Sequence, residues 1–302
     1  MTRVLVTGGT GFLGRFVVAS LLLDGHEVTV FDWKPNRAAL DDIEPGMSSR
    51  VAYVEGDITD GSVRDAASGC GAIIHLAGVM TVECARDPVR GAQINLIGSL
   101  QVFEAARAHG IDRIAYVSTA GVFGPDDEIN PRPMTHYGAQ KLAIEGSARA
   151  YLLDHGIPSI GFRPYIVYGP GQSSGIAAGP SIACSAAFRG EPATIRFSGR
   201  AGFVLVADVA ELMVRAISNP VEGAEAHTLC GETAEMDDFV QALRSEIPGA
   251  DITVEGPPLR IPGDLANSDL PASLASLPVT GVRDGIASIL QFYRDRQTEV
   301  AS

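Results

Sequence analysis

Short apolar runs alternate with longer amphipathic stretches through the first half of the chain. The runs at 4–6, 27–31, 51–55, 72–75, 114–118 and 160–163 have the length and composition of buried strands. Helical periodicity covers 12–23, 93–108 and 136–155, and Gly110 is a natural stop for the second of these stretches. Strands that alternate with helices predict βαβ units and therefore a doubly wound, mainly parallel α/β sheet.

The pattern changes after Pro164. Residues 169–180 read GPGQSSGIAAGP and predict a mobile loop, whereas 203–217 return to a strand followed by a helix. Residues 245–282 hold most of the remaining prolines, and a last amphipathic helix is expected near 286–295. We therefore expect a sheet domain over 1–167, to which 203–218 return. Residues 168–202 and 219–302 are expected to form mainly a smaller, interleaved substrate lobe.

Composition and charge narrow the class of protein. The 302 residues are 46% apolar and 20% charged, which is ordinary for a globular protein, and the net charge of −13 disfavours nucleic acid and anionic membrane as partners. The first apolar run is too short for a signal peptide. The sequence contains no run of 18 apolar residues, so we expect no membrane span. Cysteines at 70, 84, 184 and 230 lack metal-ligand spacing. We expect a cytoplasmic protein with mostly buried, reduced thiols and no metal.

The segment 7–14, TGGTGFLG, is the strongest local signal. Gly8, Gly11 and Gly14 lie between a predicted strand and a predicted helix, the context of a Rossmann dinucleotide-binding turn. Gly8 would allow the sharp turn, Gly11 the approach of a pyrophosphate, and Gly14 close packing of helix on strand. Asp32 follows 18 residues after Gly14 and would accept both ribose hydroxyls while repelling a 2′-phosphate. The motif therefore predicts NAD rather than NADP, against the alternative of a turn with surplus glycines.

A second signal is the YxxxK pair of Tyr137 and Lys141. Positions i and i+4 share one helix face, so the ammonium group is expected to lower the pKa of the phenol and to allow proton exchange near neutral pH. Ser118 and Thr119 end a predicted strand, at the edge where an open α/β sheet binds its ligands.

With these motifs the chain resembles the extended short-chain dehydrogenase/reductases, the NAD-dependent epimerase/dehydratase family. The resemblance covers about 3–215 and includes TGGTGFLG (7–14), GDITD (56–60), HLAG (75–78), NLIGS (95–99), STAGVFG (118–124), YGAQK (137–141) and RPYIVYGPG (163–171). It implies hydride transfer at a secondary alcohol. Tyr137 would exchange the proton of the hydroxyl, Lys141 would bind the nicotinamide ribose, and Thr119 would hydrogen-bond the reacting oxygen.

The motifs and the resemblance together assign the site residues. The catalytic residues are Thr119, Tyr137 and Lys141. Cofactor binding is assigned to Gly8, Gly11, Phe12, Leu13, Gly14, Asp32, Trp33, Asp57, Ile58, Leu76, Ala77, Gly78, Asn95, Tyr137, Lys141, Tyr165 and Val167. Substrate binding is assigned to Met80, Thr81, Ser118, Thr119, Tyr165, Ile166 and Arg200.

Three departures from the family pattern bear on the substrate. Ile166 stands where nucleotide-sugar epimerases often carry an asparagine, and Arg200 lies one position away from the arginine that grips their diphosphate. The stretch between Gly124 and Tyr137 is also short for this family. They favour a dehydrogenase that uses free NAD on a sugar, a sugar acid or a similar small alcohol. The alternative is a nucleotide-sugar epimerase with retained NAD. A dehydratase is disfavoured because Ala120 and Gly121 replace the expected acids. A non-catalytic NAD-binding protein is the third reading.

The helices expected at 93–108 and 136–155 also resemble those that pair across a dimer in this family. Leu96, Leu100 and Phe103 form an apolar stripe beyond what the sheet requires, so we expect a homodimer.

Overall fold

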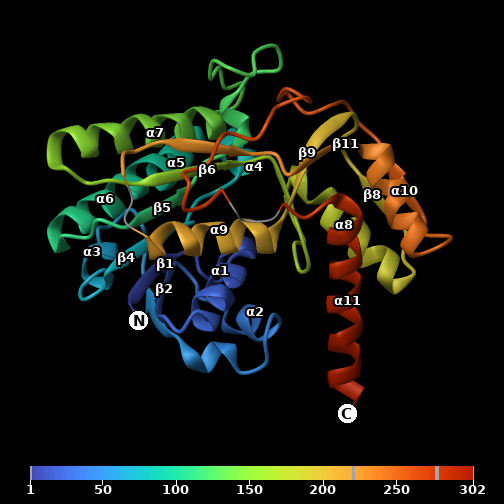
Figure 1. Ribbon diagram of the computed structural model, residues 1–302, viewed down its shortest axis with the longest axis horizontal. Coiled ribbons are helices and arrows are strands. Elements are labelled where there is room, and N and C mark those ends of the chain that lie inside the picture. The colour runs from blue at the N-terminus through green and yellow to red at the C-terminus, as the bar shows by residue number, and fades with distance from the viewer. Residues whose placement is uncertain (1, 220–221, 276–278, 302) are drawn as a thin grey trace.

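The computed structural model describes residues 2–219, 222–275 and 279–301 (Figure 1). The strands are β1 (Arg3–Thr7), β2 (Glu27–Asp32), β3 (Ala52–Glu55), β4 (Ala72–His75), β5 (Ile114–Val117), β6 (Ile160–Pro164), β7 (Ile166–Tyr168), β8 (Ala193–Ile195), β9 (Arg200–Leu205), β10 (Ala226–Leu229), β11 (Glu232–Glu235) and β12 (Ile252–Val254). The α-helices are α1 (Phe12–Leu23), α2 (Arg37–Asp41), α3 (Val63–Ala66), α4 (Thr81–Arg86), α5 (Pro88–Ala92), α6 (Gly98–His109), α7 (His136–His155), α8 (Gly179–Arg189), α9 (Val206–Ser218), α10 (Met236–Glu246) and α11 (Val282–Ala301). A π-helical turn covers Gln93–Ile97, and short 3-10 turns cover Met47–Arg50, Ala120–Val122 and Ile176–Ala178.

Seven strands form the central sheet in the order β10-β6-β5-β4-β1-β2-β3, and every neighbouring pair is parallel. This arrangement confirms the predicted doubly wound α/β fold. Residues that alternate along each strand point to opposite faces. Val4 and Val6 pack with α1 and α9, while Leu5 packs on the other face with α3, α6 and α7. Figure 1 shows these two helical layers on either side of the sheet.

The second lobe is built around two smaller sheets. β7, β9 and β11 form one, with β9 central, and β8 pairs with β12 in the other. The large side chains of Tyr168, Phe203 and Phe239 meet edge-on or stacked in their shared core, which α8, α10 and α11 cover. β9 therefore belongs to this sheet, whereas α9 directly after it packs against α1. β10, from the segment expected in the substrate lobe, is an edge strand of the central sheet.

The structure corrects several expected boundaries. The expected helix at 93–108 begins as the π-helical turn before α6, and the expected loop at 169–180 ends in a 3-10 turn with α8 starting at Gly179. Phe103 is only 1% exposed and lies between Tyr116 and Tyr151, so it belongs to the protein's own core and not to an unpartnered stripe. Leu96 is partly buried against the same core.

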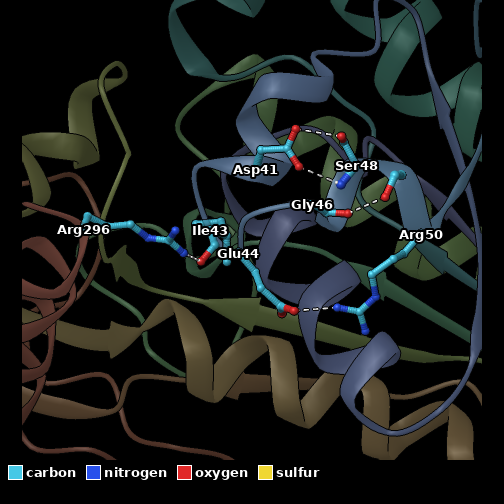
Figure 2. A network of polar contacts seen from close by, with 8 residues as sticks. Asp41, Ile43, Glu44, Gly46, Ser48, Arg50 and Arg296 are labelled. Carbon is cyan, nitrogen blue, oxygen red and sulfur yellow. Dashed lines mark hydrogen bonds and ion pairs between the residues drawn. The ribbon is translucent and has the colours of Figure 1, made fainter. Parts of the chain in front are cut away.

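The C-terminal helix reaches back to the first half of the chain. Figure 2 shows the guanidinium of Arg296, on α11, pointing to the carbonyl oxygen of Ile43, just after α2. The segment around Ile43 is itself braced, because Asp41 accepts bonds from the backbone and side chain of Ser48. This contact joins the two lobes on the side of the sheet where β2 and β3 lie.

No helix in the described part of the chain is both long and apolar enough to cross a membrane. Within the same residues, no group of three His, Cys, Asp or Glu side chains could hold a metal ion. The four cysteines are free thiols, and all four are buried, which agrees with the prediction that most of them are buried.

Candidate active site

The glycine turn between β1 and α1 has the shape that its sequence predicts. Gly8 has a φ of 70°, and a Cβ there would lie 2.9 Å from the backbone nitrogen of Ala77. A Cβ on Gly14 would overlap the carbonyl oxygen of Gly8. Gly11 is the N-cap of α1 and supplies no side-chain cap, so the first N–H groups of the helix stay available to an anion.

The two predicted acids on the adenosine side are held differently. Asp32 ends β2, and its Oδ2 accepts bonds from the hydroxyl (2.7 Å) and backbone nitrogen (3.3 Å) of Thr10, in the glycine turn. Asp57 accepts bonds from Thr59 and forms an ion pair of 2.9 Å with Arg90. The hydrogen bonds from Thr59, with Arg90, keep the pKa of Asp57 below its ordinary value.

The remaining residues predicted to bind adenosine lie near these acids. Trp33 is 64% exposed, and its ring carries the ammonium of Lys34 at 4.5 Å from the centroid. Ile58 is buried and packs against the position of Gly98, where a Cβ would approach it within 2.7 Å.

A buried polar chain links the ends of β1 and β4 to the π-helical turn. The Thr7 hydroxyl oxygen accepts the N–H groups of Leu76 and Ala77 at 3.2 Å and lies 2.7 Å from Nδ1 of His75. Nε2 of His75 lies 2.8 Å from the hydroxyl of Ser99. Burial, aided by the charge of Lys141, lowers the pKa of His75 to about 3, so His75 is a neutral structural group rather than an acid or a base.

Asn95 fixes the loop that follows β4. Its Oδ1 accepts the N–H of Val79 at 2.8 Å, and its Nδ2 donates to the Val79 carbonyl at 2.9 Å. Nδ2 also lies 2.9 Å from Oε1 of Gln140, on α7. Asn95 is fully buried, and these bonds give it a structural role between the loop and the helix that carries Tyr137.

The predicted catalytic side chains meet at one end of the sheet. Tyr137 and Lys141 lie one turn apart on α7, with the Lys141 Nζ 5.8 Å from the centroid of the Tyr137 ring. Nζ donates to the carbonyl oxygen of Val117 at 2.8 Å, at the end of β5. Thr119 follows directly, and its hydroxyl oxygen accepts the N–H of Gly121 at 3.0 Å.

Burial controls the protonation of this pair. It raises the pKa of Tyr137 above its ordinary value and lowers that of Lys141 to about 8. The expected lowering of the phenol pKa by Lys141 is therefore wrong for the protein alone. The ammonium is directed to a backbone carbonyl, and the apolar surroundings oppose a phenolate.

A cavity of about 420 Å³ brings most of the predicted site together. Its wall contains the predicted residues Gly8, Gly11, Phe12, Leu13, Gly14, Leu76, Gly78, Met80, Ser118, Thr119, Tyr137, Lys141, Tyr165 and Val167. It also contains residues that the sequence analysis missed, namely Arg15, Val117, Pro164, Gly171, Gln172, Ser173, Ser174 and Ala177. The GPGQSS run was the available signal for the loop residues, because a Gly-rich loop after a parallel strand lies at the ligand-binding edge.

Three residues that were assigned to the substrate do not line this cavity. Ile166 is 1% exposed and lies in the core of the second lobe, not in the cavity wall. Arg200 lies outside that wall and pairs at 2.5 Å with Asp264. Thr81 begins α4 and is also absent from the wall. Ser118 does line the cavity, but its hydroxyl donates to the buried Glu145 at 2.5 Å.

Arg163 lies in β6, and Tyr165 is the first residue after that strand. Tyr165 is buried in the cavity wall, and its hydroxyl donates to the carbonyl oxygen of Ile261 at 3.3 Å. Arg163 is structural, as expected, because it pairs with Glu145.

Comparisons with known proteins agree with this geometry. The profile of the NAD dependent epimerase/dehydratase family matches residues 4–230. A UDP-glucose 4-epimerase of Mycolicibacterium smegmatis is 30% identical over 314 positions, covering 97% of this chain and 99% of that protein. The NAD complex of Thermus thermophilus UDP-glucose 4-epimerase is 29% identical with a TM-score of 0.79, covering 97% of this chain and 99% of that one.

The fold also occurs with a different activity. An L-threonine dehydrogenase from Cupriavidus necator has a TM-score of 0.84 at 19% identity, covering 96% of this chain and 99% of that one, a likeness of fold alone. The profile match spans most of the sequence, and the mycobacterial relative aligns along nearly its whole length. The chain therefore belongs to the NAD-dependent epimerase/dehydratase family of extended short-chain dehydrogenase/reductases, whose cofactor is NAD.

Proposed function

We propose that the protein is an epimerase that inverts a hydroxyl-bearing carbon of a nucleotide sugar and retains its NAD between turnovers. The observation that carries this proposal is the full-length similarity to a UDP-glucose 4-epimerase, which covers 97% of this chain. The cavity supports it, because Thr119, Tyr137 and Lys141 line one wall of the same space as the glycine turn. The comparisons thus favour the alternative of the sequence analysis over its main reading.

The residues present fit a dinucleotide. A Cβ at Gly8 would fill the turn, and the uncapped start of α1 offers N–H groups to a diphosphate. Gly8, Gly11, Phe12, Leu13 and Gly14 would hold the diphosphate, and Asp32 the adenosine ribose. When bound, NAD supplies a hydride acceptor that can return the hydride to either face of a ketone.

The chain's own residues supply positioning and proton transfer. Tyr137 removes the proton of the substrate hydroxyl during oxidation and returns a proton to the oxygen after the hydride comes back. Thr119 hydrogen-bonds the same oxygen and holds its carbon in place. Lys141, nearly excluded from solvent, binds the ribose beside Tyr137. Both lobes contribute residues to the cavity wall.

A single preparation tests this function. The protein is purified without added nucleotide and denatured, and the released NAD is quantified by chromatography. The native enzyme is then incubated with UDP-glucose while absorbance at 340 nm is followed. We expect about one NAD per subunit, conversion to the C4 epimer and no net NADH. Tyr137→Phe is the matched control and should hold NAD without converting the sugar.

A dehydrogenase with exchanging NAD is the second candidate. It is favoured by Ile166, which lies in the core, and by Arg200, which is paired with Asp264 outside the cavity wall. Little released NAD, together with NADH formation from a free sugar or sugar acid, would establish it in place of the epimerase. Tight NAD binding with no conversion of any of these substrates would instead indicate a non-catalytic NAD-binding protein.

We further propose that the protein is a homodimer that pairs through α6 and α7, which lie together on one face of the sheet. Light scattering at micromolar concentration should give about twice the subunit mass of 31.6 kDa. A mass of one subunit would contradict the dimer.

A further inference from the structure

Arg15 is a buried cation in the wall of the cavity that the reaction scheme leaves without a role. It lies in the first turns of α1, is 7% exposed, and shares the cavity wall with Gly11 and Gly14. Its Nη2 donates to the carbonyl oxygen of Gly171 at 2.6 Å, while its Nε is buried without a hydrogen-bond partner. Among the described residues, no carboxylate forms an ion pair with Arg15.

This arrangement is unfavourable unless an anion joins it. A guanidinium keeps its charge at any physiological pH, and a buried charge without a counter-charge is strongly disfavoured. Burial accordingly lowers the pKa of Arg15 below its ordinary value, although Asp42 and Tyr293 oppose the shift. Two independent features therefore face the same space, an unpaired cation and the uncapped N-terminus of α1. Both favour a diphosphate, with which a guanidinium forms charge-assisted hydrogen bonds.

Arg15 also ties two segments that lie far apart in the sequence. Gly171 has a φ of 80°, and a Cβ there would lie 2.8 Å from the Arg15 guanidinium nitrogens. The N–H of Gly171 donates to the Tyr293 hydroxyl at 3.3 Å, so the backbone at this position is held from both sides. The residues that follow, Gln172 to Ser174, line the cavity. Arg15 thus connects the helix after the glycine turn to the 171–174 loop in the same cavity wall.

We propose that Arg15 binds the diphosphate of NAD and, through Gly171, holds the 171–174 loop against the cofactor, so that Arg15 sets how tightly NAD is retained. The proposal deepens the proposed function, because it rests on a cofactor that stays bound. It assigns to one side chain the property that separates an epimerase with recycled NAD from a dehydrogenase with exchanging NAD.

The test compares Arg15→Met, which removes the charge and keeps an apolar stem, with Arg15→Lys, which keeps the charge. Arg107→Met is the matched control, because Arg107 is half-exposed at the end of α6 and pairs with Glu104 away from the cavity. NAD content is measured after purification. Dissociation constants for NAD, ADP-ribose, adenosine and UDP are then measured by calorimetry on protein stripped of nucleotide.

We expect Arg15→Met to weaken NAD and ADP-ribose by about 10- to 100-fold and to be purified without NAD, as the loss of a charge-assisted hydrogen bond predicts. Adenosine and UDP should bind to Arg15→Met as they bind to the wild type. Arg15→Lys should lose less NAD affinity than Arg15→Met, and Arg107→Met should keep the NAD affinity of the wild type. Unchanged NAD binding in Arg15→Met would overturn the proposal. An equal loss for adenosine would overturn it too, because it would show a structural defect. Weaker binding of UDP alone would show that the guanidinium contacts the substrate and not NAD, and it would equally refute the assignment.

The Arg15→Lys variant and a separate activity assay complete the experiment. If Arg15→Met does not fold, Arg15→Lys carries the comparison, because one ammonium group cannot reach both the Gly171 carbonyl and the diphosphate as a guanidinium can. An NAD affinity equal to that of the wild type in Arg15→Lys, at both low and high salt, would overturn the proposal. Epimerase activity is assayed separately in the wild type. A wild type that binds NAD through Arg15 but does not convert UDP-glucose would refute the proposed function and leave the role of Arg15 standing.

Discussion

Glu145 is the buried acid that joins the helix of Tyr137 to the end of two central strands. Its carboxylate accepts the Ser118 hydroxyl at 2.5 Å, from the end of β5, and both Nε (2.8 Å) and Nη2 (2.5 Å) of Arg163, from β6. The Glu145 side chain is 0% exposed and that of Arg163 is 15% exposed. Because Thr119 directly follows Ser118, this cluster links the end of β5, next to the proposed catalytic hydroxyl, to α7.

The two single variants remove different parts of the pair. Arg163→Met leaves a buried carboxylate with only the Ser118 hydroxyl, and breaking a buried pair in this way costs about 3–5 kcal/mol. Glu145→Gln keeps the shape of the side chain and removes its charge. It should lower the free energy of unfolding by only about 1–3 kcal/mol, because the Arg163 left without its partner retains some access to water. A typical domain has only about 5–15 kcal/mol of stability, so the first loss alone is severe. In the double variant no charge is left unpaired, and we expect its loss to fall short of the summed single losses by about 2 kcal/mol.

Urea unfolding followed by far-ultraviolet circular dichroism measures this coupling energy. The control is the exposed pair of Arg196 and Glu255, whose side chains are 75% and 61% exposed and lie 3.3 Å apart. Arg196→Met and Glu255→Gln should couple by less than about 0.5 kcal/mol. A coupling at Glu145 and Arg163 no larger than that of the exposed pair would refute the reasoning.

Three further predictions concern the site. Tyr137→Phe should lower turnover by about 10²- to 10⁴-fold while NAD content stays at the wild-type level, and near-normal turnover would remove Tyr137 from the mechanism. Lys141 is charged below about pH 8 in the folded protein and below 10.5 when unfolded, so the unfolded state binds more protons between these values. The contribution of Lys141 to stability should therefore rise over that range by at most about 3 kcal/mol. Urea unfolding should show it as a difference between the wild type and Lys141→Met that shifts in favour of the wild type as pH rises, and a difference independent of pH would contradict it. Asn95→Ala removes both bonds to Val79 and should cost about 1–3 kcal/mol in thermal or urea unfolding, with faster hydrogen exchange at Val79; unchanged exchange there would contradict the structural role.

The central sheet could be predicted because its pattern is local. Each parallel strand is a short apolar run, and each crossover helix carries its own periodicity and stop signal. The sequence pattern did not predict β10, because its four residues include His227 and Thr228, polar residues that a buried strand rarely contains. Their partners come from a distant loop, since His227 Nδ1 bonds the Asp269 carbonyl and the Thr228 N–H bonds Ser268. Such compensation cannot be read from the strand itself.

The same division applies to the candidate site. The glycine turn and the pair on α7 are contiguous motifs, and their residues line one cavity. Arg15 was missed because its partner, Gly171, lies 156 positions away. Arg200 lies outside the cavity wall, because its place in a family pattern does not decide which acid its side chain pairs with, and in the fold that acid is Asp264. The place of Ile166 in the core could not be predicted for a related reason, since its burial in the second lobe depends on the register of β7 with β9.

The electrostatics of Tyr137 and Lys141 bear on the proposal that NAD is retained between turnovers. The spacing alone predicts a phenol made acidic by its neighbour, yet burial raises the pKa of Tyr137, and Lys141 is bound to the Val117 carbonyl. Tyr137 is therefore a proton donor at neutral pH in the protein alone. In the proposed mechanism it must become an acceptor, which requires more positive charge in the cavity, and an oxidised nicotinamide ring would carry such a charge. We infer that removal of the substrate proton requires an occupied cavity, and a phenolate absorbance near neutral pH in NAD-free protein, absent from Tyr137→Phe, would contradict this. An enzyme with this dependence can start a turnover as soon as the sugar binds only if the cofactor is already in place.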